Sequence, residues 1–277
     1  MKSLKIYYLS SEIDPFSNTY SLATFSKQFN TILNDYKHID IRLIQPKYGY
    51  ISERKYILRE VIRLKDLTIN FNKKDHIVNL KSAFIPNSRV QLYFMEHKKY
   101  FSEIPELLYK SRNGRLYQNN HEKFSFFTKT VIESLDKLFW FPDIIICNDW
   151  QMSFLPILFN QKYKKLDKFK KTKIVSMIHA YDDMYKYPNS LFENNDLDYE
   201  KKKRSQNTLE LAFKYSDLVY MFDDGKLMKS INKVKSLKNS LNKRKHKIID
   251  MSLIEDNSDK IDLYNKIKSD LESLSKK

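Results

Sequence analysis

Four short polar segments of this sequence could carry chemistry, because each directly follows an apolar run with the pattern of a buried strand. These segments are residues 10–21, 148–150, 179–182 and 223–225. In an open parallel sheet, ligands bind in the crevice beyond the carboxyl ends of the strands. The sequence therefore predicts that the four segments meet at one edge of a sheet and form the functional site there.

His179 and Asp149 are the residues in these segments best suited to chemistry. A histidine at the end of a strand could donate a hydrogen bond to a ligand hydroxyl or carry a proton, or it could simply bond to nearby backbone. Asp149 could orient a ligand hydroxyl, or it could cap the helix expected after it. Residue type and position alone leave both pairs of alternatives open.

The sequence offers little for metal or thiol chemistry. Asp182 and Asp183 are adjacent, so their side chains point in different directions, and no third ligand is apparent. Cys147, the single cysteine, lies in an apolar run and is expected to be an inert core thiol, because a nucleophilic cysteine needs surroundings that favour the thiolate. A single cysteine also excludes an intrachain disulfide, which fits a reducing compartment. We therefore expect no metal, no cofactor and a cytoplasmic location.

The composition is that of a globular chain with a strong positive charge. Of the 277 residues, 42% are hydrophobic, and 50 Lys and Arg against 34 Asp and Glu give a formal net charge of +16. Lysine is spread over every segment, often beside Asn and Ile, which favours compositional drift over a nucleic-acid-binding patch. No run approaches the ~18 apolar residues that span a membrane. Neither nucleic acid nor membrane is expected as a partner.

The elements that must position the four segments alternate between apolar runs and helical patterns. Strands are predicted at 5–9, 41–44, 142–147, 173–178 and 218–222, and helices at about 21–35, 121–139, 152–160 and 205–215. This alternation is typical of a parallel sheet with crossover helices, so the predicted class is α/β, Rossmann-like, with an open parallel sheet. Three β-like runs between residues 57 and 95 predict a small antiparallel insertion. Residues 226–277, rich in Lys, Ser, Asn and Asp, predict surface helices or a flexible tail.

Several stretches together carry the motifs of one family. They are "SSEIDPFSNTYSLA" at 10–23, "QPKYG" at 45–49, "VQLYFMEHKKYF" at 90–101, "LYQNNHEKFSFF" at 116–127, "WFPDIIICNDWQMSFLP" at 140–156 and "KIVSMIHAYD" at 173–182. In this order and spacing they resemble the N-terminal half of the bacterial glycogen synthases and plant starch synthases. The aspartate-tryptophan block around Asp149 is the most specific of them. The resemblance covers roughly residues 4–222.

The resemblance implies one half of a GT-B glycosyltransferase, a fold in which two Rossmann-like domains face each other across a cleft without a metal ion. Residues 1–225 would form the N-terminal domain, and residues 226–277 show no strand alternation or glycine-rich loop of a second domain. Family members transfer glucose from ADP-glucose (or UDP-glucose) to an α-1,4-glucan with retention of configuration. A separate chain would then supply the second half. The alternative is a catalytically inactive glucan-binding or scaffold protein derived from such a synthase.

The resemblance also assigns roles to single residues. It implies that His179 contacts the transferred sugar, that Asp149 positions glucose in the same cleft, and that Tyr117 lines the acceptor side. Glu12 and Thr19, matched in the opening loop, would bind substrate. The chain departs from the family's pattern in that loop and after the strand histidine, and these departures favour the inactive alternative. The family's lysine, glycine pair and aspartate are replaced by Asn18, Tyr20-Ser21 and Thr24, and the asparagine after the histidine is Ala180.

Overall fold

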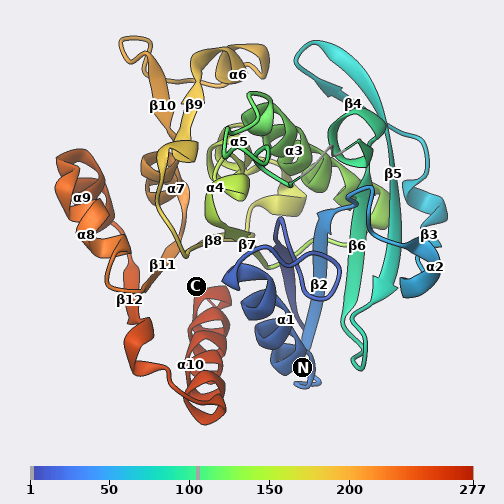
Figure 1. Ribbon diagram of the computed structural model, residues 1–277, viewed down its shortest axis with the longest axis horizontal. Coiled ribbons are helices and arrows are strands. Elements are labelled where there is room, and N and C mark those ends of the chain that lie inside the picture. The colour runs from blue at the N-terminus through green and yellow to red at the C-terminus, as the bar shows by residue number, and fades with distance from the viewer. Residues whose placement is uncertain (1–2, 104–106, 277) are drawn as a thin grey trace.

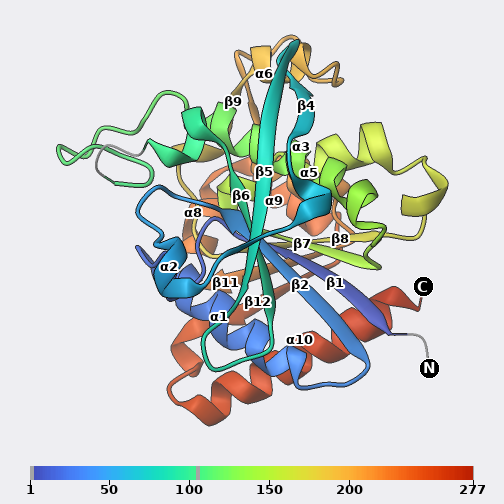
Figure 2. The ribbon, with the colours of Figure 1, turned by 90° about the vertical axis from the view of Figure 1, so that its right-hand side faces the viewer.

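The computed structural model describes residues 3–103 and 107–276, and a mostly parallel sheet runs through it with helices on both faces (Figures 1 and 2). Its strands are β1 (Leu4–Leu9), β2 (Ile39–Pro46), β3 (Arg59–Glu60), β4 (Leu67–Phe71), β5 (Lys74–Phe84), β6 (Gln91–Glu96), β7 (Ile144–Asn148), β8 (Lys173–Ile178), β11 (Leu218–Asp223) and β12 (His246–Asp250). Their order in the sheet is β12-β11-β8-β7-β1-β2-β6-β5-β3, and β4 pairs with β5.

Helices connect and cover these strands. They are α1 (Ser21–Asn34), α2 (Glu53–Tyr56), α3 (Asn120–Leu138), α4 (Asp149–Met152), α5 (Leu155–Leu158), α6 (Asn189–Asn194), α7 (Thr208–Tyr215), α8 (Leu227–Lys233), α9 (Lys235–Asn242) and α10 (Asn257–Ser275). Single turns of 3-10 or π geometry lie at Ile62–Leu64, Lys98–Ser102, Phe159–Tyr163, Asp167–Phe169, Asp183–Tyr185 and Met251–Leu253. No helix in the described ranges is long and apolar enough to cross a membrane.

The structure confirms the predicted open parallel α/β sheet. Each strand in the run β11-β8-β7-β1-β2-β6 is parallel to the next strand of that run. All five residues of β7 are buried, as expected for a central strand covered on both faces. The predicted antiparallel insertion is also present, because β3 and β4 both pair antiparallel with β5, which pairs antiparallel with β6.

One predicted helix begins later than the sequence pattern indicates. Residues 205–207 form β10 (Ser205–Asn207), which pairs antiparallel with β9 (Lys186–Pro188), and α7 starts only at Thr208. The side chain of Asn207 accepts hydrogen bonds from the backbone N–H groups of Leu209 and Glu210. This N-cap fixes the start of the helix, because it satisfies amides that have no partner inside the first turn.

The segment predicted as surface helices or a flexible tail, residues 226–277, contributes a strand that the sequence pattern did not predict. Strand β12 extends the sheet by pairing in parallel with β11. Its side chains are half-buried or exposed, so it lacks the apolar run of the central strands. Helix α10 then crosses to α1 (Figure 1), where Tyr264 packs on Phe25 and Phe29 with ring centroids 5.6 Å from each.

Candidate functional site

The four polar segments follow strands that are neighbours in the sheet. Strands β1, β7, β8 and β11 lie side by side and run in parallel. The loop after β1, Asp149 after β7 and His179 after β8 therefore leave the sheet at the same edge. Hydrogen bonds join these three segments, as described below.

Asp149 ties the end of β7 to the end of β8. Its Oδ1 accepts hydrogen bonds from the backbone N–H of His179 at 2.6 Å and of Ala180 at 3.3 Å. Its Oδ2 accepts from the hydroxyl of Tyr20 at 3.3 Å. The recorded bonds of the carboxylate thus go to the β8 turn and to the opening loop, and not to the amides of α4, the helix that Asp149 begins.

The backbone and charge of Asp149 are both unusual. Its φ of +52° lies in the left-handed region, which few residues other than glycine adopt, and its side chain is buried. Burial raises the pKa of the carboxyl from 3.8 to about 7, although the amides of His179 and Ala180 and the Tyr20 hydroxyl act in the opposite direction. Near neutral pH, Asp149 can therefore exist with or without its proton.

His179 presents a ring nitrogen that has no partner. The imidazole is stacked on Phe222 with centroids 4.5 Å apart and planes 4° apart, and Phe25 meets it edge-on at 4.8 Å. Its Nε2 is buried and forms no hydrogen bond with any described residue. Burial lowers the pKa of the imidazole to about 3, so the ring is neutral at physiological pH. A neutral, fixed imidazole can bind one ligand group through Nε2.

Glu12 and Thr19 bind each other across the opening loop. The Thr19 backbone N–H and hydroxyl each donate to the Glu12 carboxylate at 2.6 Å. The hydroxyl of Tyr109 donates to the same carboxylate at 2.7 Å and to the Ser11 hydroxyl at 2.9 Å. Glu12 is fully buried, and this burial raises the pKa of its carboxyl. These bonds hold the loop in a closed shape.

Tyr20 occupies space beside Asp149. Besides its bond to Asp149, its hydroxyl accepts from the side-chain amide of Gln151 at 3.2 Å, and its ring meets Tyr109 edge-on. Asn18 in the same loop is exposed and donates to Asp14, whose other oxygen binds Lys27 at 2.7 Å. The loop therefore has the amide of Asn18 where the family that it resembles has a lysine, and the ring of Tyr20 where that family has a glycine pair.

Tyr117 lies apart from the other candidate residues. The ammonium of Lys123 is 5.0 Å from the centroid of its ring, and its buried hydroxyl has no partner among the described residues. Its backbone N–H donates to the carbonyl of Tyr109 at 3.0 Å. No recorded side-chain contact joins Tyr117 to Asp149 or His179 within the described parts of the chain. Its connection to Glu12 runs through this backbone bond to Tyr109, whose hydroxyl binds the Glu12 carboxylate.

A cavity of about 400 Å³ opens beside the loop. Its lining consists of residues 15–19, 50–52, 55 and 56. The Tyr50 hydroxyl donates to Ser17 and that of Tyr56 to the Pro15 carbonyl, each at 2.9 Å, so the turn after β2 is fastened to the loop. Gly49 precedes this turn and allows a close approach, because a Cβ there would lie 2.1 Å from the Ser102 carbonyl oxygen. Among the described residues, no cluster of three or more His, Cys, Asp or Glu side chains could hold a metal ion.

Comparison with known proteins identifies the family. The family model for the starch synthase catalytic domain matches residues 5–224. This chain belongs to the starch synthase catalytic-domain family. The matched range runs from β1 to the end of β11, so the family assignment includes every residue of the candidate site.

Curated relatives of the family are longer than this chain. A glycogen synthase of Chlorobaculum parvum is 34% identical over 224 residues, which are 79% of this chain and 45% of that protein. A glycogen synthase of Chlorobium luteolum is 36% identical over 178 residues, or 64% of this chain and 36% of that protein. The chain thus spans about half the length, or less, of these relatives.

A solved structure of the family shares the fold. The catalytic domain of starch synthase IV from Arabidopsis thaliana, bound to ADP and acarbose, aligns with a TM-score of 0.73 at 19% identity. The alignment covers 90% of this chain and 51% of that chain. The fold of this chain is therefore that of one half of a GT-B starch synthase domain.

Two residues of the site carried no signal that singled them out in the sequence, and a third was marked only by its position in a motif. Tyr109 binds Glu12 across 97 positions of sequence, Phe222 stacks on His179, and Gln151 binds Tyr20. Gln151 lies in the block that resembles the family's motif, two residues after Asp149, and this position was the available clue. Tyr109 and Phe222 could be read only as core aromatics, which they also are.

Proposed function

We propose that this chain is the N-terminal half of a glucosyltransferase that moves glucose from ADP-glucose to an α-1,4-glucan with retention of configuration. The observation that carries the proposal is the unpartnered Nε2 of His179 at the carboxyl edge of a sheet whose matched residues, 5–224, belong to the starch synthase catalytic domain. The glycogen synthases of Chlorobaculum parvum and Chlorobium luteolum support the substrate class by their names. The ADP and acarbose bound to the Arabidopsis domain support both a nucleotide donor and a glucan-like acceptor.

In this proposal His179 holds the transferred glucose. Its Nε2 would bond to a hydroxyl of the donor sugar, since this buried nitrogen gains a partner that the resting protein does not provide. Phe222, stacked on the imidazole, and Phe25, which meets it edge-on, fix the His179 ring, so the bond to the sugar requires little reorganisation. Because the pKa of His179 is lowered to about 3, the imidazole acts as a neutral hydrogen-bonding group and not as a proton carrier at pH 7.

Asp149 positions glucose and the His179 turn together. Its Oδ1 keeps the backbone of His179 in place, while its Oδ2, bonded to Tyr20 in the resting state, is the atom that a sugar hydroxyl would take over. This exchange requires the Tyr20 hydroxyl to move away. Glu12 and Thr19 would support substrate binding by fixing the loop, and Tyr117 would line the acceptor side with its unpartnered hydroxyl.

The reaction needs a second wall, which we propose is the other GT-B half. The matched part is 45% of the Chlorobaculum parvum glycogen synthase, so that relative has further residues from which a second wall can form. We place the reaction in the cytoplasm, in keeping with the free, buried thiol of Cys147, whose pKa burial raises. No metal or cofactor enters the proposed mechanism.

Incorporation of labelled glucose tests the proposal. Purified protein would be incubated with labelled ADP-glucose and a glucan primer, alone and together with the C-terminal half of the Chlorobaculum parvum glycogen synthase. The expected result is incorporation with the added half that is lost in His179→Ala and kept in His38→Ala. His38 is the matched control, because it is a surface histidine that pairs with Glu272 at 2.8 Å.

Each outcome has a distinct meaning. No incorporation at any protein concentration, with or without the second half, would overturn the transferase proposal. Binding of the primer without incorporation would instead identify a glucan-binding protein without turnover. Equal incorporation from labelled UDP-glucose would overturn the choice of ADP-glucose and leave glucosyl transfer standing.

A further inference from the structure

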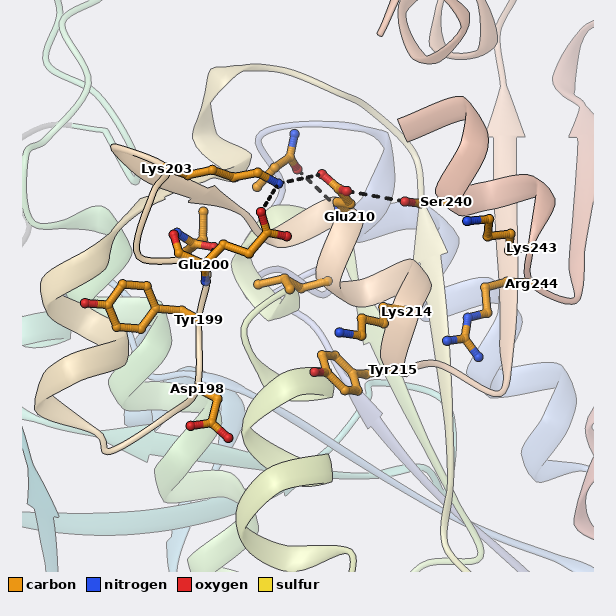
Figure 3. A pocket seen from close by; sticks show the side chains of 13 residues that line it. Asp198, Tyr199, Glu200, Lys203, Glu210, Lys214, Tyr215, Ser240, Lys243 and Arg244 are labelled. Atoms are coloured by element: carbon orange, nitrogen blue, oxygen red, sulfur yellow. Dashed lines mark hydrogen bonds and ion pairs between the residues drawn. The ribbon is translucent and has the colours of Figure 1, made fainter. Parts of the chain in front are cut away.

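A second polar cavity, of about 420 Å³, lies away from Asp149 and His179. It is enclosed by the segment after α6, by β10 and α7, and by the end of α9 (Figure 3). Its lining is Asp198, Tyr199, Glu200, Lys203, Gln206, Asn207, Glu210, Leu211, Lys214, Tyr215, Ser240, Lys243 and Arg244. None of these residues belongs to the candidate transferase site.

The cavity has an acidic side on which one lysine bridges two of three carboxylates. The Lys203 ammonium lies 3.1 Å from a carboxylate oxygen of Glu200 and 3.7 Å from one of Glu210. The Ser240 hydroxyl donates to the other oxygen of Glu210 at 3.4 Å. These carboxylates keep lone pairs that can accept hydrogen bonds from hydroxyl groups.

The opposite side is basic and unbalanced. Figure 3 shows Lys243 and Arg244 across the cavity from Asp198 and Glu200, with Lys214 and Tyr215 between the two sides. Within the described residues, Lys214, Lys243 and Arg244 form no ion pair with any carboxylate. Three cations around one cavity repel each other, so an anion bound among them would be stabilised.

An adjoining cavity strengthens the case for Lys214 and Arg244. It has a volume of about 170 Å³ and shares Lys214, Tyr215 and Arg244 with the larger cavity. The two cations therefore border hollow space on two sides. The Lys214 ammonium lies 5.1 Å from the centroid of the Tyr215 ring, which keeps it close to the cavity wall.

We propose that this cavity binds a phosphorylated monosaccharide. The phosphate would lie between Lys214 and Arg244, near Lys243, because a guanidinium offers paired donors and two ammonium groups add charge. The sugar hydroxyls would face the carboxylates of Asp198 and Glu200, and the Tyr215 ring would flank the apolar face of the sugar. A volume of about 420 Å³ lies within the usual range of small-ligand sites.

The mixed lining selects a small ligand over a polymer of phosphates. Asp198, Glu200 and Glu210 would repel a nucleic-acid backbone that continued past the three cations. Free phosphate would leave the carboxylates of the acidic side without a hydroxyl partner. The site is independent of the glucosyl transfer proposed above, since the loss of either function would leave the residues of the other in place.

Calorimetric titration of the full chain tests the site. Glucose 1-phosphate, glucose and inorganic phosphate would be titrated separately at low and high salt. We expect glucose 1-phosphate to bind about tenfold or more tightly than either glucose or phosphate, with an affinity that falls as salt rises. A Lys214→Gln/Arg244→Gln variant should lose about tenfold or more in affinity.

A matched variant separates the site from general charge. Lys229→Gln/Lys235→Gln removes the same charge from exposed positions of α8 and α9 outside the cavity lining and should keep the wild-type affinity. No binding of glucose 1-phosphate by the wild type would overturn the proposal, as would equal losses in the two variants. Equal affinity for inorganic phosphate would overturn the assignment of a saccharide.

Discussion

Replacing Tyr20 by phenylalanine should weaken the folded protein and at the same time strengthen sugar binding. The substitution removes the hydroxyl that donates to Asp149 at 3.3 Å and accepts from Gln151 at 3.2 Å. Both bonds are long, so together they are worth about 1–2 kcal/mol. A ligand hydroxyl that takes the place of the Tyr20 hydroxyl must first break them.

The size of the gain follows from that competition. If breaking the two bonds costs about 1–2 kcal/mol, their removal should raise the apparent affinity for sugar by about 5- to 30-fold. The free energy of unfolding of the unliganded protein should fall by a similar amount, because the variant leaves buried groups of Asp149 and Gln151 without this partner. Since the Tyr20 hydroxyl lowers the pKa of Asp149, its loss should also raise that pKa further.

Calorimetric titration with ADP-glucose and urea unfolding measure the two effects. Tyr36→Phe is the matched control, because it also removes a tyrosine hydroxyl that donates one hydrogen bond, to Asn265 at 2.7 Å, but Tyr36 lies beyond the other end of α1 from Tyr20. The control should lose stability without any gain in affinity. If Tyr20→Phe bound ADP-glucose no better than the wild type, the reasoning that Tyr20 competes with a substrate hydroxyl would be refuted, whatever the result of the transfer assay.

Three further changes test other parts of the structure. The carboxyl of Asp149 has a pKa of about 7 in the folded protein against 3.8 in the unfolded chain, so the wild type loses stability as pH rises from about 4 to and through 7. Asp149→Asn lacks this loss and should therefore gain up to about 4 kcal/mol relative to the wild type over that range. Urea midpoints across pH 4–9 measure the difference. Burial and His76 lower the pKa of His97 from 6.5 to about 4, so the wild type loses up to about 3 kcal/mol of folding stability as pH falls from 6.5 towards 4. His97→Gln should remove this loss. The difference in stability between wild type and variant is the quantity to measure, because the raised pKa values of buried carboxyls act in the opposite direction in both proteins. Gly49→Ala should cost about 1–3 kcal/mol in urea unfolding, because its Cβ would lie 2.1 Å from the Ser102 carbonyl oxygen, and an unchanged midpoint would contradict the close approach.

The central part of the fold was predictable because its strands are buried on both faces. Residues 144–147 are apolar without interruption, and residues 174–178 are apolar except for Ser176. A strand with one face in solvent would alternate apolar and polar residues, and both runs instead form central parallel strands. Strand β12 gave no such signal, since an edge strand with exposed side chains can be polar. Residues 205–207 fit the helical pattern of the residues after them. The cap at Asn207, which starts the helix at Thr208, departs from that pattern over only a few positions.

The candidate site was predictable in position but not in bonding. Parallel strand ends share an edge, so Asp149 and His179 could be expected near each other from the strand pattern. Sequence pattern could not show that Asp149 bonds to the amides of the His179 turn, or that Tyr109 reaches Glu12, because such contacts depend on how distant segments pack. The alternative that Asp149 caps its own helix had the same sequence support as the arrangement found.

The bonding pattern also determines where a ligand gains most. In the opening loop, Glu12 is bonded to Thr19 and Tyr109, Asn18 to Asp14, and Tyr20 to Asp149, so a substrate that contacts any of these groups replaces an existing bond. Such an exchange contributes little net free energy.

A buried polar atom without a partner behaves differently, because a ligand bond there removes a desolvation penalty that the resting protein already carries. Among the residues proposed to bind substrate, the His179 Nε2 and the Tyr117 hydroxyl are the buried side-chain atoms without a partner in the described chain. Sugar recognition should therefore depend more steeply on His179 and Tyr117 than on the residues of the loop that identifies the family.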